Sequence, residues 1–451
     1  MQHMALGLVL GLFHAMYDIL QNFTRNMIEI AAPNLSYHRD QIASTAYRRC
    51  RPNTTSNTTL MYSLPQELID AIIDEIHNDS DARIAWRTLK SCGLVSRIFV
   101  RRTREHLFRE ITIRSIHEDQ KFLARSQVHS FVTSLTIKFQ SRIRYGGYCT
   151  ISTLTEFPFL IGVLPNVNKI KLCGMDWKSL SQRFIDSLAS RSFVSITLMH
   201  THFPDSNAFY SFLSHLPNLR QFSCFKTTID DNDRPPFSAN FDASHRPRIT
   251  ELSLRKMNQI PAMILSPALS PVNLQSLRIL DVFLDEIGQF DQARRFMGLT
   301  AQSLEVLRVS QLITPPPDQS QHLPIECLKS IIIEIKDCRL DVFNWWIEHF
   351  ERYPAMQCSC VHLFVCVTTN QVKKLADYTG WKRLDIALSR TSIRSLVVTL
   401  LVTSAKTRAS KHSPMKSVIR ENLPILMSHQ IARVQVGLYK NEVVGGNFHI
   451  F

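Results

Sequence analysis

The chain has 451 residues, of which 45% are hydrophobic and 20% are charged, a composition typical of globular proteins that excludes global disorder. Glycine is scarce, at 13 residues, and neither G-x-G-x-x-G nor G-x-x-x-x-G-K-[ST] occurs, which disfavours Gly-rich nucleotide-binding folds. The net charge of +14 at pH 7 favours acidic partners such as nucleic acid, an anionic membrane or an acidic protein surface.

The N-terminal part of the chain begins with an apolar run, residues 4–13, which is too short to span a bilayer. The run has the length of a signal-peptide core, but no Lys or Arg precedes it. Residues 33–62 are polar and basic without an apolar period, so we expect residues 1–62 to be disordered or weakly ordered. Secretion stays open as an alternative, in which the sequons at Asn53 and Asn57 would be glycosylation sites.

Three helical patterns follow over residues 63–108. Ser63 and Gln66 are spaced to cap the first helix, whose apolar residues recur at helical spacing: Leu64, Leu68, Ile69, Ile72, Ile73 and Ile76. The second pattern carries Leu89, Cys92, Val95 and Phe99, and the third, which is basic, runs over residues 100–108. Residues 111–113 then predict a strand.

From residue 130 onward, a segment of the form apolar-x-x-apolar-x-apolar recurs. Its middle residues are 24 to 35 positions apart: Leu135, Ile170, Ile196, Phe222, Leu252, Leu280, Leu307, Ile331, Leu363 and Leu396. Leucine-rich repeats have a period of about 20–29 residues and the frame L-x-x-L-x-L. We therefore expect residues 130–400 to stack one strand per repeat into a parallel sheet backed by helices. A generic α/β domain is the alternative, because the asparagine typical of such repeats is mostly absent.

Two kinds of segment separate the expected strands. Apolar residues at helical spacing predict helices around 184–188, 209–213 and 343–350. The stretches 230–248 and 314–324 lengthen the spacing and predict inserted loops, which are candidates for lining a binding surface.

Residues 371–420 hold eleven Lys or Arg against two Asp, so most of the net charge is concentrated there. A solvated face with a flexible loop explains this most simply, and we expect residues 401–451 to form a basic loop and a C-terminal cap. Aromatic residues are sparse in this region, so nucleic acid is not an expected partner. The alternative is a nucleic-acid or membrane surface whose binding weakens steeply with salt, formed by Lys406, Arg408, Lys411 and Lys416.

The ten cysteines are scattered and form no C-x-x-C pair. Cys358, Cys360 and Cys366 are close in sequence but lack a second ligand pair at zinc spacing. This pattern predicts free thiols in a reducing compartment, so we expect a cytoplasmic or nuclear protein without a metal or a cofactor.

The segment 63–113 contains three motifs of one known family. They are Leu64-Pro65-x-Glu67-Leu68-Ile69, Cys92-x-Leu94-Val95-Ser96 and a basic helix that ends in Leu107-Phe108. Together they resemble an F-box, and most of all the F-box-like domain of large families in mushroom-forming fungi, which a repeat array usually follows. Two departures are that Ile98-Phe99 stands where the family often has Trp, and that Gly93 lies within the second helix.

The resemblance implies an α/β fold, with an N-terminal three-helix F-box followed by a leucine-rich-repeat-like α/β solenoid. It implies a substrate-receptor subunit of a Skp-cullin-F-box type ubiquitin ligase, in which the F-box binds a Skp-type adaptor and thereby a cullin-RING ligase. The repeats would bind a protein substrate that the sequence does not identify. The expected adaptor contacts are Leu64, Pro65, Leu68, Ile72, Ile73, Leu94 and Val95, whereas Cys92, Phe99 and Leu107 are expected in the core.

Catalytic signatures are missing from the sequence. It contains no G-x-S-x-G, H-E-x-x-H or kinase motif, so we expect the chain not to be an enzyme. The main alternative is a leucine-rich-repeat protein-binding scaffold with no role in ubiquitin transfer, which would not need the motifs of residues 63–113.

Overall fold

The computed structural model describes residues 65–78, 82–113, 128–138, 161–230, 246–257, 259–266, 270–311, 322–368, 371, 374–375, 377–402, 417 and 419–438. These divide into a helical unit, residues 65–111 with 128–133, and a sheet unit, residues 112–113 with 134–438. Residues 1–64, most of the two expected inserted loops, and the lysines and arginine between 406 and 416 lie outside the described residues.

The described part of the helical unit contains three α-helices, α4 (Gln66–His77), α5 (Ala82–Val95) and α6 (Arg97–Phe108), and a short 3-10 helix, His129–Phe131. The carbonyl of Pro65 accepts hydrogen bonds from the amides of Leu68 and Ile69 at the start of α4. Ser96 caps α6, where its hydroxyl accepts the amide of Ile98 at 3.4 Å. The expected continuation of the second helix through Phe99 is therefore wrong, because the Ser96 side chain offers the backbone a helix start instead.

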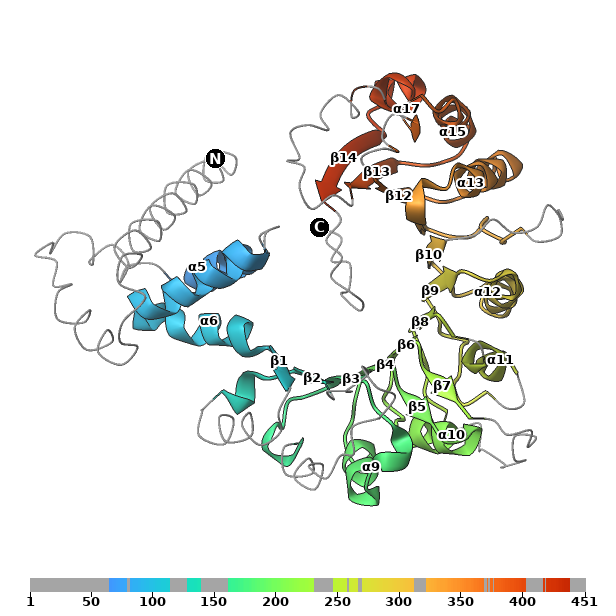
Figure 1. Ribbon diagram of the computed structural model, residues 1–451. Helices are drawn as coiled ribbons and strands as arrows, with labels where there is room; N and C mark the ends of the chain where they lie inside the picture. The colour runs from blue at the N-terminus through green and yellow to red at the C-terminus, as the bar shows by residue number, and fades with distance from the viewer. Residues whose placement is uncertain are drawn as a thin grey trace, which may run out of the picture. The chain divides into compact units, whose positions relative to one another are not determined.

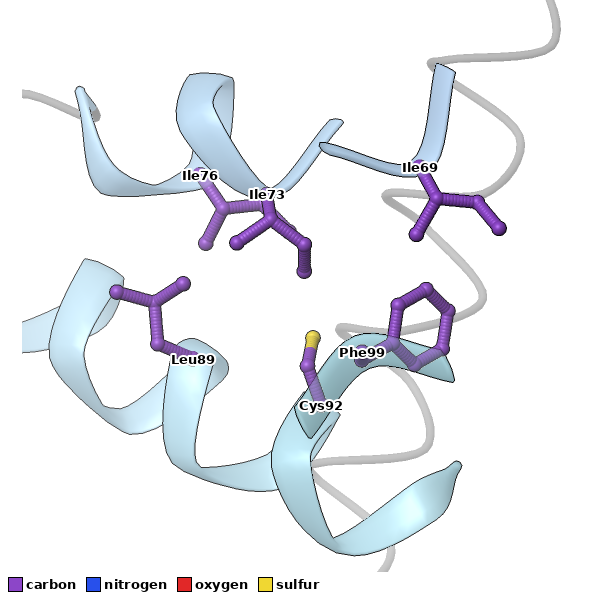
Figure 2. Close-up of a cluster of buried hydrophobic side chains, with 6 residues drawn as sticks. All are labelled: Ile69, Ile73, Ile76, Leu89, Cys92 and Phe99. Atoms are coloured by element: carbon purple, nitrogen blue, oxygen red, sulfur yellow. The ribbon is translucent and has the colours of Figure 1, made fainter. Parts of the chain in front are cut away.

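The core of the helical unit lies between all three helices. Figure 2 shows side chains from α4 pointing toward those from α5 and α6, and six of them are buried: Ile69, Ile73, Ile76, Leu89, Cys92 and Phe99. Each large apolar side chain buried in this way contributes about 1.5–3 kcal/mol. The expected core positions of Cys92 and Phe99 are confirmed, and Leu107 packs against this cluster while partly buried.

The sheet unit is built on a twelve-stranded sheet in which neighbouring strands follow chain order, apart from two strands that pair separately. The pairings described from β2 to β14 are parallel, which confirms an α/β fold with a large parallel sheet. The row runs from β1 at one edge to β14 at the other, so the sheet is open. Its strands are β1 (Glu110–Ile113), β2 (Ser134–Lys138), β3 (Lys169–Cys173), β4 (Ser195–Met199), β6 (Gln221–Phe225), β8 (Glu251–Arg255), β9 (Ile279–Leu284), β10 (Val306–Gln311), β11 (Ser330–Ile335), β12 (Cys360–Val367), β13 (Ser395–Val402) and β14 (Ala432–Leu438).

Within the described ranges, helices connect β3 to β4, β4 to β6, and the neighbouring strands from β8 to β10 and from β11 to β14. They lie on the same side of the row of strands (Figure 1). Those around residues 184, 209 and 343 are where the apolar spacing predicted them. The helices are α9 (Gln182–Ala189), α10 (Ser206–Ser214), α11 (Ile260–Leu265), α12 (Ile287–Leu299), α13 (Leu340–Arg352), α15 (Gly380–Ser389) and α17 (Pro424–Ser428). A second, two-stranded parallel sheet pairs β5 (His202–Phe203) with β7 (Thr228–Ile229).

The register of the strands follows the repeated apolar pattern. Leu135, Ile170 and Ile196 occupy equivalent positions in neighbouring strands, and all three are buried. In β12, however, the register aligns Val361 with Ile331, so the expected ninth copy centred on Leu363 is displaced by two residues. Because side chains alternate with a period of two along a strand, this displacement leaves the same face buried.

The sheet extends beyond the expected end of the repeats. The boundary expected after residue 400 falls inside β13, and β14 adds a further parallel strand. The apolar pattern missed β14 because its buried residues Ala432 and Val434 are small and do not follow the leucine frame. The helix α17 lies between β13 and β14 in the chain. At its start, the amides of Ile425 and Leu426 donate to the buried carboxylate of Asp385 on α15, at 2.9 Å each.

Candidate functional site

The exposed apolar side chains of the helical unit are concentrated on α5. Leu94 is 89% exposed, Trp86 50% and Val95 46%, while Leu68 on α4 is 43% exposed. Burying such side chains against a partner removes apolar surface from water, which is the dominant favourable contribution to most protein association. This surface is therefore the candidate docking site of the unit.

Two sides of α5 have different roles. Ala85, Leu89 and Cys92 are buried and recur at helical spacing on the side that faces the core. Trp86 and Leu94 lie on the outer side, with Lys90 between them at four-residue spacing. The ammonium group of Lys90 lies 3.6 Å from the centroid of the Trp86 ring, an arrangement that orders both side chains. We call Trp86, Lys90 and Leu94 the outer stripe of α5.

The structure separates the expected adaptor contacts by burial. Pro65, Leu68, Leu94 and Val95 are exposed, as a contact surface requires. Ile72 is partly buried against the core, and Leu64 lies outside the described residues.

Ile73 corrects the expected set of adaptor contacts, because it is fully buried. Its exposed fraction is 0%, and it shares the inner side of α4 with Ile69 and Ile76. Apolar residues on two adjoining sides of one helix cannot be divided into inner and outer ones from spacing alone. The sequence did not indicate Trp86 as a contact, because the apolar pattern predicted the second helix only from Leu89 onward. Its four-residue spacing to Lys90 and Leu94 is the signal that would have revealed it.

An ion-pair network holds α4 against α6. The Nε and a terminal nitrogen of Arg102 donate to the two carboxylate oxygens of Asp74, each at 2.6 Å. Arg102 also bonds Glu105 at 2.7 Å, and Nε2 of His106 lies 2.7 Å from Asp74. The hydrogen bond from Arg102 lowers the pKa of Asp74 to about 2, so the carboxylate stays charged at neutral pH. The two-pronged geometry holds α4 and α6 in one relative orientation.

The face of the sheet away from the helices, which we call the helix-distal face, carries paired polar residues at its centre. Arg255 binds Asp281 at 2.7 Å, and Arg308 binds Glu251 at 3.3 Å. Asp281 also accepts the hydroxyl of Ser253 at 3.0 Å. Ser253 and Asp281 are register partners on β8 and β9, whereas the pair of Arg308 with Glu251 reaches from β10 across β9 to β8. These ion pairs link three strands and stabilise the sheet, so their charged groups are engaged with one another.

Toward the C-terminal strands, the helix-distal face becomes more apolar. Ile332, His362 and Val397 are register neighbours on β11, β12 and β13, and all three are partly exposed. The ring of Phe364 packs edge-on against His362, with ring centroids 5.7 Å apart. A face that combines satisfied charges with partly exposed apolar residues has the character of a protein-binding surface.

Within the described ranges, no three His, Cys, Asp or Glu side chains lie together as they would around a metal ion. The eight described cysteines are free thiols. Burial raises the pKa of Cys92 to about 11 and that of Cys366 to about 12, so both stay protonated at neutral pH. Of the described helices, none is both long and apolar enough to cross a membrane.

Comparisons with known proteins assign no family to the chain. No protein-family model matches it, and no curated protein matches it. The two surfaces described above are therefore the features from which a function can be proposed.

Proposed function

We propose that the chain is the substrate-receptor subunit of a Skp-cullin-F-box type ubiquitin ligase. In this proposal the helical unit is an F-box that binds a Skp-type adaptor and, through it, a cullin-RING ligase. The sheet unit is a leucine-rich-repeat-like solenoid that binds a protein substrate. The chain itself contributes no catalytic group and acts by holding the substrate near the ubiquitin-transferring subunits.

The observation that carries the proposal is the exposed apolar surface of α4 and α5. The F-box-like motif supplies both parts of this arrangement: Ile69 and Cys92 form the core, while Leu68 and Leu94 remain exposed. A unit of about 50 residues buries only a modest core, so apolar surface left outside is well suited to a partner. Trp86 adds a large ring to the same helix, and Trp is among the residues that contribute most to protein interfaces.

The sheet unit supports the second half of the proposal. One parallel strand per apolar repeat, with helices on one side, is the arrangement that stacked repeats of the leucine-rich type require. The helix-distal face then offers an extended surface of paired charges and partly exposed apolar groups for a protein substrate. A generic α/β domain would not need spacings near those of leucine-rich repeats.

Mixing the full chain with a recombinant Skp-type adaptor tests the proposal. Size-exclusion chromatography with light scattering should show a 1:1 complex. The variant Leu94→Asp should weaken the complex by about 30-fold or more, because it places a charge in an apolar contact. Leu299→Asp is the matched control, since Leu299 is 53% exposed on α12 and should leave the complex intact. Circular dichroism of both variants shows whether they are folded.

Two outcomes would overturn the proposal: a folded wild-type chain that forms no complex, or a complex that Leu94→Asp and Leu299→Asp affect equally. Either result would leave the sheet unit as a protein-binding scaffold without a role in ubiquitin transfer.

A further inference from the structure

The residues that directly follow β3, β4, β6 and β8 share a left-handed backbone conformation. Gly174, His200, Lys226 and Lys256 occupy equivalent register positions, with φ values of 73°, 51°, 47° and 54°. The amides of the first three each donate to the carbonyl that ends the next strand, at 2.8, 2.8 and 3.1 Å. The left-handed turn is thus a regular feature at the carboxyl ends of these strands, which together form one edge of the sheet.

Three of these four positions carry a side chain despite the backbone conformation. Glycine adopts a positive φ without steric cost, whereas other residues pay roughly 1–2 kcal/mol there. The chain has glycine at the first position only, and His200, Lys226 and Lys256 occupy the others. Because strained residues are concentrated at functional sites, these three side chains are candidates for a binding role.

The side chains form a row of cations and aromatic rings. The ammonium group of Lys226 lies 5.7 Å from the centroid of the Phe225 ring, and that of Lys256 lies 5.1 Å from the centroid of the Phe283 ring. The ring of His200 meets Phe225 edge-on at 5.3 Å between centroids. Burial, followed by the charge of Lys226, lowers the pKa of His200, in keeping with how closely the two side chains approach. We call these five residues the cationic edge.

Among the residues that the structure describes, no carboxylate forms an ion pair with the lysines of the cationic edge. Lys226 and Lys256 are both exposed. Asp281 on β9 and Asp230 after β7 bind other cations, Arg255 and Lys178. The two ammonium groups are therefore free to bind anionic groups of a partner.

We propose that the cationic edge binds an acidic segment of the protein substrate. Asp or Glu carboxylates of the segment bind the ammonium groups of Lys226 and Lys256, and its apolar atoms contact the partly exposed ring of Phe225. The inference rests on the proposed role of the sheet unit in substrate binding and is independent of adaptor docking. An acidic protein segment fits better than nucleic acid, because lysine ammonium groups already lie over the ring faces on which bases would stack.

A labelled Glu-rich peptide, titrated with the full chain at low salt and followed by fluorescence anisotropy, tests this inference. The wild-type chain should bind, and binding should weaken as salt is raised. The variant Lys226→Gly/Lys256→Gly should bind at least about fivefold more weakly, because it removes two ion pairs. Its melting temperature should equal or exceed that of the wild type, because glycine relieves the left-handed strain. Weaker peptide binding without a lower melting temperature would show that the two lysines act in binding and not in folding.

Two further variants complete the design. Lys226→Arg/Lys256→Arg keeps the charges and should retain binding. Lys382→Gln/Arg390→Gln removes two exposed charges at α15 and its C-terminal end, and it should bind the peptide as the wild type does.

The inference is overturned if the wild-type chain does not bind the peptide, if the glycine variant binds equally well, or if only a labelled single-stranded oligonucleotide binds. Adaptor binding measured on the same preparations distinguishes the two proposals. A wild-type chain that binds the adaptor but not the peptide contradicts only the cationic edge, whereas one that binds the peptide but not the adaptor contradicts only the ligase role.

Discussion

At the scale of single residues, burial determines the protonation state of His349 on α13. The side chain is 0% exposed, and its Nε2 accepts the amide of Leu323 at 2.9 Å. Because an amide can only donate, Nε2 carries no proton, and Nδ1 donates to the carbonyl of Trp345 at 3.2 Å. Desolvation, followed by the neighbouring His322, lowers the pKa of His349 to about 3.

This histidine should make the stability of the sheet unit depend on pH. The pKa of His349 is about 3 in the folded chain and about 6.5 when unfolded, so the unfolded chain binds more protons between these values. The free energy of unfolding should therefore fall as the pH is lowered from about 6.5 toward 3. Thermal unfolding at several pH values should show a shallower decline for His349→Gln than for the wild type. Equal declines would contradict the neutral, buried state.

A second residue-scale prediction concerns Gly93 within α5. A methyl group at this position would meet Cγ2 of Thr103 at 3.4 Å, an ordinary van der Waals contact. Alanine favours a helix interior over glycine by about 1 kcal/mol, so Gly93→Ala should stabilise the helical unit by up to that amount. Amide hydrogen exchange of α5 measures the change. Faster exchange in the variant would show that the site next to Thr103 does not accept the methyl group.

At the scale of elements, the sequence predicted regular apolar repeats well and irregular ends poorly. The expected helices around Phe184, Phe209 and Phe343 exist because each buries an apolar stripe against the sheet. Three features were missed: the helix break at Ser96, the register at Val361 and strand β14. Periodicity alone does not detect these features, because none of them changes the apolar pattern much. The hydroxyl of Ser96 caps a helix without altering the spacing, a shift of two residues keeps the same face of β12 buried, and β14 buries small residues.

The C-terminal elements depend on Asp385, and this can be tested. Its carboxylate accepts the amides of Ile425 and Leu426 at 2.9 Å each. Asp385→Ala should lower the free energy of unfolding by about 3 kcal/mol, because two hydrogen bonds to a charged group are lost. Asp385→Asn keeps one acceptor and should lose less. Thermal unfolding of both variants provides the comparison, and equal losses would contradict a capping role.

At the scale of the whole molecule, the helical unit and the sheet unit carry separate candidate surfaces. The sequence located both units, because the motifs of residues 63–113 and the repeats after residue 130 differ in period. It identified Leu68 and Leu94 as surface residues but misplaced Ile73, since spacing does not tell which apolar side of a helix turns inward. The cationic edge escaped notice because left-handed turns after successive strands leave no periodic apolar signal.

The two surfaces should act independently. Leu94→Asp should weaken adaptor binding and leave the affinity for the Glu-rich peptide unchanged, whereas Lys226→Gly/Lys256→Gly should do the reverse. The two changes lie in different units, and we expect the double variant to show the sum of the single effects. Titrations of all three variants with each ligand test this expectation. A change in peptide affinity caused by Leu94→Asp would contradict the division of roles.

The central claim is that the helical unit binds a Skp-type adaptor through the exposed residues of α4 and α5. Hydrogen exchange of the full chain, measured with and without the adaptor, tests it most directly. We expect slower exchange over residues 66–96 in the complex, and unchanged exchange in β8 and β9. A complex in which only amides of the sheet unit are protected, or the absence of any complex with the folded chain, would contradict the claim.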